Sequence, residues 1–425
     1  MKVAVVGAGW GGLACAVGAT RAGHAVTLFE AARQAGGRAR RVDDLHGLAL
    51  DNGQHILIGA YTATLALMRE VGVDVDTALL RLPLTLRFAD GGGLQVPARL
   101  PPPLDLLTGI ATARGWAWRD KLGLLRAALR WQRDGFRCAP GASVDLLCGA
   151  LTPRVREELI EPLCVSALNT PAAQASGTVF LRVLQDALFG ERGGADLLLP
   201  RVDLGALLPD PALRWLATRG VQLRLGTRVQ AVIRQCAVAP TEGWRVDGQP
   251  FDRIVLACAP WDAVRLVHAA SLPEAAPWLD RTEALRHESI ATVYAKAPGV
   301  RLRAPLLALR ANANAPAQFV FDRGQLGGPP GLLAFVVSAS DAPREALQAA
   351  VLRQARTQLD LGAIEALQTV VERRATFACT PGLVRPAMHI APGLLACGDY
   401  VDGPYPATIE GAVRSGSNAA IDLAS

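Results

Sequence analysis

Glycines near the N-terminus have the spacing that binding of a dinucleotide phosphate requires. Gly7, Gly9 and Gly12 fit the pattern G-x-G-x-x-G, in which the first glycine permits a tight turn. The second lets the backbone approach a pyrophosphate, and the third lets a helix pack closely on a strand. Glu30 follows Gly12 by eighteen residues. Its carboxylate can accept hydrogen bonds from ribose hydroxyls, which disfavours the 2′-phosphate of NADP.

The elements around these glycines form a predicted β-α-β unit. The β-branched run 2–6 predicts a buried parallel strand, residues 13–22 a helix, and residues 25–29 a second strand. The phosphates would then lie at the positive end of the helix. Residues 3–20 carry no charge and could pass for a signal peptide or a membrane span. The five glycines in that run are better explained by the nucleotide-binding turn.

Two further stretches carry groups suited to the same ligand. Gly37 and Arg38 bring flexible backbone and a guanidinium close behind Glu30, and residues 51–55 read Asp-Asn-Gly-Gln-His. Near the C-terminus, the apolar run 393–397 predicts a buried strand that leads to Gly398 and Asp399.

The order of these motifs resembles the flavoprotein superfamily of amine oxidases, phytoene desaturases and protoporphyrinogen oxidase. The resemblance implies FAD as the cofactor, with Arg38 near the diphosphate, residues 51–55 near the flavin ring and Asp399 near the ribitol or diphosphate. A final helix opening within residues 405–416 would point N–H groups at the flavin, and its dipole would stabilise the reduced form. The residues implied to bind FAD are Gly7, Gly9, Trp10, Gly11, Gly12, Glu30, Ala31, Gly37, Arg38, Gly53, Gln54, His55, Val229, Gly398, Asp399, Thr408 and Ile409.

Because the cofactor motifs return at three places in the chain, we expect an α/β fold with a discontinuous, Rossmann-like FAD-binding domain. An α+β substrate domain would be interleaved with it. The predicted FAD-binding domain comprises residues 1–80, 215–262 and 385–425, and the predicted substrate domain comprises residues 81–214 and 263–384. The 425 residues allow two or three domains, and the interleaving favours two.

The composition excludes several classes of protein. The chain is 51% apolar and 19% charged, with a mean hydropathy of +0.24, which argues against disorder. Only three of the 44 basic residues are lysines, so the net charge of +6 reflects biased composition and gives little support to nucleic-acid binding. The eight cysteines lack any CxxC or Cys/His spacing, so we expect no metal site and a reducing, cytoplasmic location.

Two inserted segments have patterns suited to binding a membrane or an apolar ligand. Residues 104–131 combine tryptophan, leucine and arginine in an amphipathic pattern, which favours a membrane-binding helix, peripheral on the inner face of the plasma membrane. A partly buried helix pair with a solvated basic face fits the same pattern equally well. Residues 157–189 predict an apolar helical pair that walls a tunnel. Asn169 either points into that tunnel, toward the substrate, or caps a helix.

Three motifs narrow the resemblance. Residues 51–55, 162–171 and 398–412 are similar to those of the hydroxysqualene dehydroxylases, bacterial FAD enzymes of squalene and hopanoid biosynthesis, and the likeness covers essentially the whole chain. It implies reduction of hydroxysqualene to squalene, with hydride passing from flavin N5 to an allylic cation. A carotenoid desaturase and a non-catalytic prenyl-lipid-binding protein stay as alternatives. An amine oxidase is disfavoured because the predicted strand at residues 289–294 has no lysine.

Loss of water from an allylic alcohol needs a proton, so the implied reaction requires an acid in a dry, apolar site. His55, Asp402 and Tyr405 are the candidates, and the sequence does not choose among them. Alternatively, His55 only packs on the flavin, while Asp402 and Tyr405 only shape a turn. The expected partner is a hydrophobic thirty-carbon isoprenoid; no nucleic acid is expected, and the sequence indicates no oligomeric state.

Overall fold

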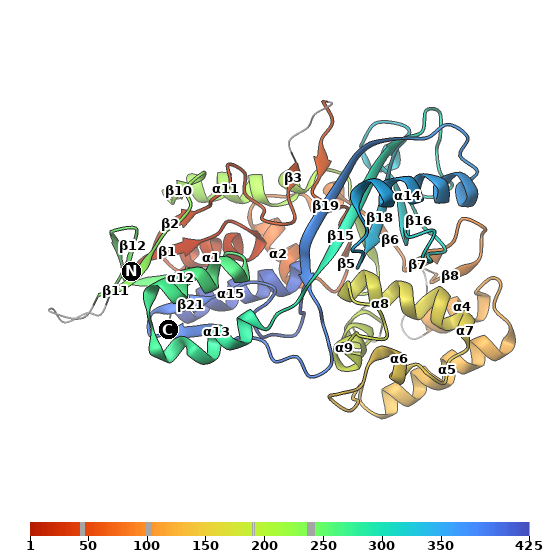
Figure 1. Cartoon of the computed structure of the whole chain (residues 1–425), viewed down its shortest axis with the longest axis horizontal. Helices are drawn as coiled ribbons and strands as arrows, with labels where there is room; N and C mark the ends of the chain where they lie inside the picture. Colours follow the sequence, from red (N-terminus) through yellow and green to blue (C-terminus); the bar gives the residue numbers. More distant parts are fainter. Residues whose placement is uncertain are drawn as a thin grey trace.

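The computed structural model describes residues 1–42, 47–97, 100, 104–188, 190, 192–235 and 243–424. Two lobes are visible in Figure 1: one holds both termini, and the other holds a curved antiparallel sheet and a group of helices. Within the described ranges, no helix is long and apolar enough to cross a membrane.

The lobe that holds the termini is built on a six-stranded sheet. In spatial order its strands are β10 (Gln222–Arg224), β2 (Ala25–Phe29), β1 (Lys2–Val6), β14 (Arg253–Leu256), β21 (Leu394–Ala396) and the antiparallel edge strand β20 (His389–Ala391). Val5 lies opposite Leu28 on one side and Val255 on the other. The central strands are apolar almost throughout because the sheet is parallel and covered on both faces. Three distant segments of the chain therefore assemble one sheet.

Helices α1 (Trp10–Arg21) and α15 (Ile409–Ala424) pack on each other beside this sheet. Their contact depends on glycine, because a side chain at position 416 would collide with the carbonyl oxygen of Gly11. The N-terminal and C-terminal helices of the chain are thus in direct backbone contact.

The other lobe is built on a five-stranded antiparallel sheet. In spatial order its strands are β16 (Leu306–Ala308), β17 (Phe319–Asp322), β18 (Leu332–Ser338), β15 (His287–Lys296) and β19 (Glu365–Phe377). One face packs under α14 (Arg344–Leu359), where Phe335 and Val351 share a core. Because side chains alternate along a strand, Val336 points to the opposite face, together with Phe319.

Helices α8 (Glu161–Leu168) and α9 (Gly177–Leu188) lie across from that second face. Beyond them are α4 (Leu104–Thr112), α5 (Trp118–Arg133), α6 (Val144–Leu147), α7 (Pro153–Val155) and the π-helical turn η1 (Arg156–Ile160).

The remaining elements are distributed over both lobes (Figure 1). The strands are β3 (Arg41–Val42), β4 (Leu50–Asp51), β5 (Leu57–Ile58), β6 (Leu79–Leu82), β7 (Thr85–Arg87), β8 (Gly93–Gln95), β9 (Leu197–Pro200), β11 (Val232–Gln235), β12 (Gly243–Val246) and β13 (Gln249–Phe251). The helices are α2 (Thr62–Glu70), α3 (Val75–Ala78), α10 (Leu204–Leu207), α11 (Pro209–Ala217), α12 (Pro260–Ala270), α13 (Ala276–Glu283), η2 (Pro273–Ala275) and η3 (Arg323–Leu326).

The predicted fold class is confirmed: a Rossmann-like α/β unit is combined with an α+β lobe. Both strands of the N-terminal unit have their predicted bounds, whereas α1 begins at Trp10, three residues before the predicted start. The uncharged run 3–20 is therefore a strand, a turn and a helix. The exact domain boundaries stay a prediction, and the one at residue 262 falls within α12.

Residues 104–131 form two helices, α4 and α5, so the helix-pair interpretation of this segment is confirmed and the single-helix one is wrong. Between them Gly115 adopts a φ of +81°, which breaks the helix. Trp116 then turns inward, and its indole Nε1 donates to the Glu158 carboxylate at 2.8 Å. The apolar pair predicted over 157–189 corresponds to η1, α8 and α9; its last residue, 189, lies outside the described residues.

Candidate active site

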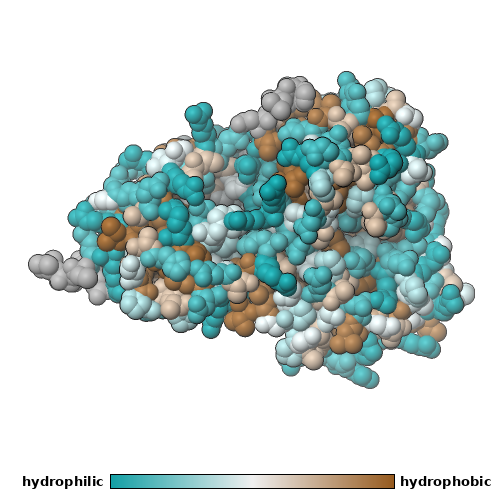
Figure 2. Space-filling model, in the orientation of Figure 1, coloured by the Kyte–Doolittle hydropathy of each residue, from teal (hydrophilic) through white to brown (hydrophobic). Residues whose placement is uncertain are grey.

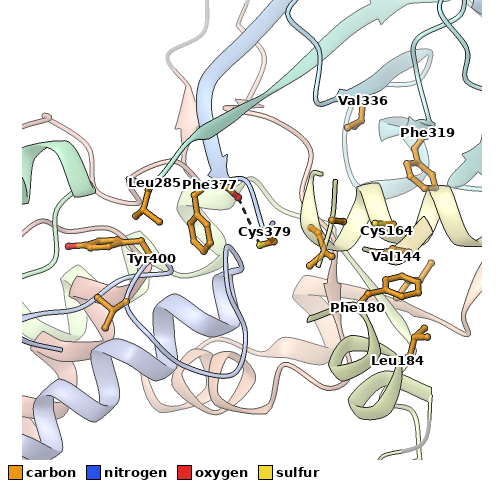
Figure 3. Packing of buried hydrophobic residues seen from close by; sticks show 14 of the residues in the cluster. Val144, Cys164, Phe180, Leu184, Leu285, Phe319, Val336, Phe377, Cys379 and Tyr400 are labelled. Carbon is orange, nitrogen blue, oxygen red and sulfur yellow. Dashed lines mark hydrogen bonds between the residues drawn. The ribbon is translucent and has the colours of Figure 1, made fainter. Parts of the chain in front are cut away.

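One cavity of about 680 Å³ extends from the glycine turn between β1 and α1 to the helices of the other lobe. At one end it is bordered by Gly9 and Glu30, and at the other by Phe180 of α9 and Phe319 of β17. Figure 3 shows these two phenylalanines with Leu184 and Val336, in an apolar region that also extends toward Tyr400. The cavity therefore joins a glycine-rich end to an apolar chamber, hereafter called the chamber.

The glycine turn leaves room where a dinucleotide phosphate would lie. Gly7 has a φ of +114°, and a Cβ there would lie 2.6 Å from the Ala257 carbonyl oxygen, so close packing requires glycine. A Cβ on Gly9 would meet only the Cα of Gly37, at 3.9 Å, so this glycine borders open space. The N-terminus of α1 beside it has no side-chain cap, which leaves its N–H groups available to an anion.

Glu30 lies at the end of β2, on the wall of the cavity. Its carboxylate accepts hydrogen bonds from the backbone N–H of Ala8 at 2.7 Å and of Ala32 at 2.8 Å. Each carboxylate oxygen retains further acceptor capacity for a ribose hydroxyl. The neighbouring Val229 also lines the cavity, and its carbonyl is held by Arg265 at 2.8 Å.

Arg38 and Asp399 form an ion pair on the cavity wall, although 361 residues separate them in the chain. A second nitrogen of Arg38 donates to the Ala375 carbonyl on β19 at 2.7 Å. Burial lowers the pKa of Arg38, but the Asp399 carboxylate outweighs it and raises the pKa above its ordinary value. The guanidinium therefore stays charged and holds three distant segments together.

The loop at residues 52–55 forms another part of the wall. His55 Nδ1 lies 3.0 Å from the Gly53 carbonyl, so Nδ1 carries the hydrogen and Nε2 is left as an acceptor. Burial and the charge of Arg38 hold the pKa of His55 below its ordinary value. Gln54 lines the cavity, and its buried Nε2 has no partner among the described residues, so it can donate to a bound ligand.

The last part of the cofactor end is the start of α15. Thr408 and Ile409 line the cavity, and the Thr408 hydroxyl accepts a hydrogen bond from Gly411 N at 3.0 Å. Glu410 is fully buried and points away. Its carboxylate accepts from the backbone N–H of Ala63 and Thr64, so it caps a different helix, α2.

Of the residues predicted to bind the cofactor, sixteen line this one cavity: Gly7, Gly9, Trp10, Gly11, Glu30, Ala31, Gly37, Arg38, Gly53, Gln54, His55, Val229, Gly398, Asp399, Thr408 and Ile409. Gly12 does not line the cavity wall. A side chain there would collide with the Gly7 carbonyl oxygen, so Gly12 permits the close contact of helix and strand.

Asn169 borders the chamber but is engaged elsewhere. It has a φ of +45° at the C-cap of α8, and its amide nitrogen donates to Ser289 O at 3.3 Å and Thr376 Oγ1 at 3.0 Å. Its amide oxygen accepts from Ala339 N at 3.0 Å. Asn169 therefore ties α8 to the five-stranded sheet, and this is the helix-cap alternative.

The candidate acids differ in whether they line the cavity. Tyr405 lines the cavity, whereas Asp402 is exposed, pairs with Arg385 at 3.2 Å and does not line the cavity. The Tyr405 ring has the guanidinium of Arg414 4.9 Å from its centre. Burial and the nearby Asp186 carboxylate raise the pKa of the Tyr405 hydroxyl.

Asp186 was missed by sequence reasoning. Among the described residues that α8 and α9 contribute to the cavity, it carries the only ionisable side chain. It accepts a hydrogen bond from Arg182 Nε, one turn earlier, at 2.7 Å. An acid in line with Val179 and Val183 on an apolar helix was the available signal, but nothing local to the helix shows that Tyr405 lies opposite.

Several known proteins are similar to this chain. A family model described as flavin containing amine oxidoreductase matches residues 10–424. The hydroxysqualene dehydroxylase of Rhodopseudomonas palustris is 30% identical, over 98% of this chain and 97% of its own. That of Sinorhizobium fredii is 28% identical, over 100% and 98%. A probable zeta-carotene desaturase of Synechococcus elongatus is 34% identical, but over only 29% of this chain and 26% of its own.

Solved structures share the fold at low identity. An oxidoreductase from Methanosarcina mazei superposes with a TM-score of 0.74 at 17% identity, over 99% of this chain and 100% of its own. Cyclohexylamine oxidase from Brevibacterium oxydans superposes with a TM-score of 0.66 at 16% identity, over 100% and 98%.

FAD is the cofactor of this site. The residues present fit it: Gly9 and the uncapped N-terminus of α1 for the diphosphate, Glu30 for the ribose, and the free Nε2 of Gln54 for a polar edge of the flavin.

Substitutions of Gly9 and Gly12 distinguish an effect on cofactor binding from an effect on folding. Gly9→Ala should leave the unfolding midpoint of the apoprotein unchanged but weaken FAD binding at least about tenfold, because its Cβ fills only the open space. Gly12→Ala should instead lower the unfolding midpoint, because its Cβ meets backbone. Flavin absorbance per protein and chemical unfolding measure the two effects. Equal flavin content in Gly9→Ala and the unsubstituted protein would contradict this assignment.

The pKa of Asp51, the residue just before the loop at residues 52–55, predicts that the stability of the protein depends on pH. It is 2% exposed, and burial raises its pKa to about 7, against the opposing hydrogen bond from Leu204 N at 2.8 Å. Because the pKa is raised in the folded state, this carboxyl favours folding most below its ordinary pKa, and the contribution is lost as the pH rises toward 7.

Asp51→Asn keeps the acceptor for Leu204 and removes the titration. The free energy of unfolding of the variant, relative to that of the unsubstituted protein, should therefore be higher at about pH 8 than at about pH 5. The expected increase is on the order of 1–3 kcal/mol. Urea unfolding at both pH values measures this gain, with the surface variant Glu70→Gln as the control. Parallel pH profiles would show that Asp51 is already ionised in the folded protein.

Proposed function

We propose that this chain, which belongs to the flavin-containing amine oxidoreductase family, reduces hydroxysqualene to squalene with FAD. The observation that carries the proposal is the continuity of one cavity, from the glycine turn to a chamber walled by Phe180, Leu184 and Phe319. Such a chamber suits a hydrocarbon and offers little to a polar substrate. The two hydroxysqualene dehydroxylases that match along nearly their whole length support the same substrate.

The reaction is a reductive dehydroxylation of an allylic alcohol. The C–O bond breaks, and the hydroxyl leaves as water after accepting one proton. A C–H bond forms at the resulting allylic cation, which needs a hydride, that is, two electrons and a proton. When bound and reduced, FAD supplies this hydride.

The protein must keep water away from the cation. Val336 and Ile290 of the five-stranded sheet and Leu168 of α8 line the chamber with hydrocarbon. Exclusion of water prevents capture of a cation by solvent and strengthens every electrostatic interaction inside. The apolar walls therefore select the substrate and protect the reaction.

We assign the proton to the hydroxyl of Tyr405, with Asp186 as its positioning residue. Both line the cavity, and the raised pKa of Tyr405 keeps Oη protonated at neutral pH. Tyr405 also lies three residues before Thr408, at the junction of the chamber with the cofactor end. His55 is a weaker candidate because its lowered pKa leaves it neutral, with Nε2 as an acceptor.

Two alternatives receive less support. The three lysines of the chain, at positions 2, 121 and 296, do not line the cavity, and Lys296 is exposed at the end of β15, so the lysine expected of an amine oxidase is missing from the site. Carotenoid desaturation is supported only by a match confined to 29% of the chain. The cysteines that the structure describes are unpaired, which supports the proposed cytoplasmic location.

A single-turnover assay tests the function. Anaerobic, chemically reduced holoenzyme mixed with hydroxysqualene should form squalene with reoxidation of the flavin in a one-to-one ratio. The oxidised holoenzyme is offered phytoene in parallel to test the desaturase alternative. Absence of squalene from a fully flavin-loaded enzyme would refute the proposal, and oxidation of phytoene would replace it.

Variants test the proton donor. Tyr405→Phe should lower the rate of squalene formation about 100-fold with unchanged flavin content, because a general acid contributes at least that much. Asp186→Asn keeps an acceptor for Tyr405, so its rate should fall less, roughly tenfold, and its pH profile should shift. Glu70→Gln, which alters a surface pair with Arg21, is the matched control. A Tyr405→Phe rate within threefold of the unsubstituted enzyme would exclude Tyr405 as the acid.

A further inference from the structure

Exposed apolar side chains gather on one part of the molecule. Eleven large hydrophobic residues are exposed among the described residues, and six of them lie between positions 104 and 146, about a tenth of the chain. They are Leu104, Leu107, Trp118, Leu122, Leu129 and Leu146, on α4, α5 and α6. We call this set the exposed apolar face. These helices lie in the lobe without the termini, and Figure 2 shows hydrophobic residues scattered there among hydrophilic ones.

The exposed apolar face follows one side of α5. Trp118 is 81% exposed, and Leu122 and Leu129 follow it at helical spacing with 45% and 57% exposure. The opposite side of α5, with Leu124 and Trp131, is buried in the main core. α5 is therefore apolar on both sides, and its buried side packs against the main core.

The outer side of α5 is also strongly basic. Its basic residues are Arg119, Lys121, Arg126, Arg130 and Arg133, whereas its single acid, Asp120, is 3% exposed. Asp120 accepts from the Thr152 hydroxyl at 2.7 Å and from Ala117 N at 2.8 Å, so its charge is turned inward. Tryptophan and leucine flanked by cations match the interface of a bilayer that contains anionic lipid.

The face is held rigidly against the rest of the lobe. Trp116, two residues before Trp118, donates to the buried Glu158 carboxylate. Glu158 also accepts from Arg154 at 3.0 Å and Arg310 at 2.9 Å. Trp116 thus anchors the start of α5, while Trp118 extends into solvent.

The same helices are continuous with the chamber. Backbone hydrogen bonds join the start of α6 to the segment before α9: Val144 N donates to Ala175 O, and Gly177 N donates to Ala142 O. Figure 3 shows Val144 next to Phe180 of the chamber wall. Contact with a membrane at this face would therefore place a cavity-lining helix near the lipid.

We infer that the exposed apolar face docks this protein on an anionic lipid bilayer, from which the hydrocarbon substrate enters the chamber. The entry of substrate rests on the proposed function, whereas docking does not. The charge of α5 selects anionic lipid, and Trp118 with its neighbouring leucines supplies the apolar contact.

Vesicle flotation of the holoenzyme tests docking without turnover. Binding should be strong to an equal mixture of phosphatidylglycerol and phosphatidylcholine, weak to phosphatidylcholine alone, and reduced by salt. Trp118→Ala/Leu122→Ala should bind at least about tenfold less. Ile233→Ala removes an exposed apolar residue on β11, in the lobe that holds the termini, and should bind like the unsubstituted protein.

The outcomes separate docking from catalysis. With detergent-dispersed substrate, Trp118→Ala/Leu122→Ala should turn over within about twofold of the unsubstituted enzyme, because these residues lie outside the cavity. Undiminished flotation of that variant would overturn the inference. A lipid-free dimer that the same variant dissociates would also overturn it, and would assign the face to a second copy of the chain.

Discussion

The ion pair between Arg38 and Asp399 is the contact on which the arrangement of the site depends. Asp399 is buried and Arg38 is half-buried, so both charges lose hydration and the pair contributes little net stability. Its main effect is to fix geometry. Arg38 also holds the Ala375 carbonyl of β19, so one guanidinium joins the loop after β2, the loop before α15 and the five-stranded sheet. The two lobes therefore meet at the cofactor end, and the chamber opens directly beside it.

A second constraint follows from the position of α15. Its backbone touches α1 where Gly416 meets Gly11, and its Glu410 caps α2 through Ala63 N and Thr64 N. A shift of α15 would thus disturb both helices at once. Because Thr408 and Ile409 begin this helix, the same packing that stabilises the lobe sets the wall of the cofactor site.

The sequence predicted the parts of the site that depend on local geometry. The glycine turn and Glu30 lie within one β-α-β unit, where spacing alone determines placement. Contacts between segments that are distant in the chain could not be predicted from spacing. For example, the sequence does not show that Glu410 caps a helix 346 residues away, through Thr64 N. Likewise, the amphipathic pattern of residues 104–131 fitted one helix or a helix pair and did not place the break at Gly115, after which Trp116 is buried and Trp118 is exposed.

A charged cofactor requires polar groups, whereas a dry chamber requires apolar walls. The fold places these two kinds of wall at opposite ends of one cavity. In the chamber every polar group needs a partner, since an unpaired buried one costs about 1–3 kcal/mol. Asn169 meets this demand with both amide hydrogens and its oxygen engaged, so it shapes the wall and is not free to react. Tyr405 and Asp186 form a different kind of pair, in which both side chains line the cavity and the Asp186 carboxylate raises the pKa of the Tyr405 hydroxyl. The proposed substrate, a hydrocarbon bearing one hydroxyl, would meet the apolar walls with its carbon chain and the pair of Tyr405 and Asp186 with its hydroxyl.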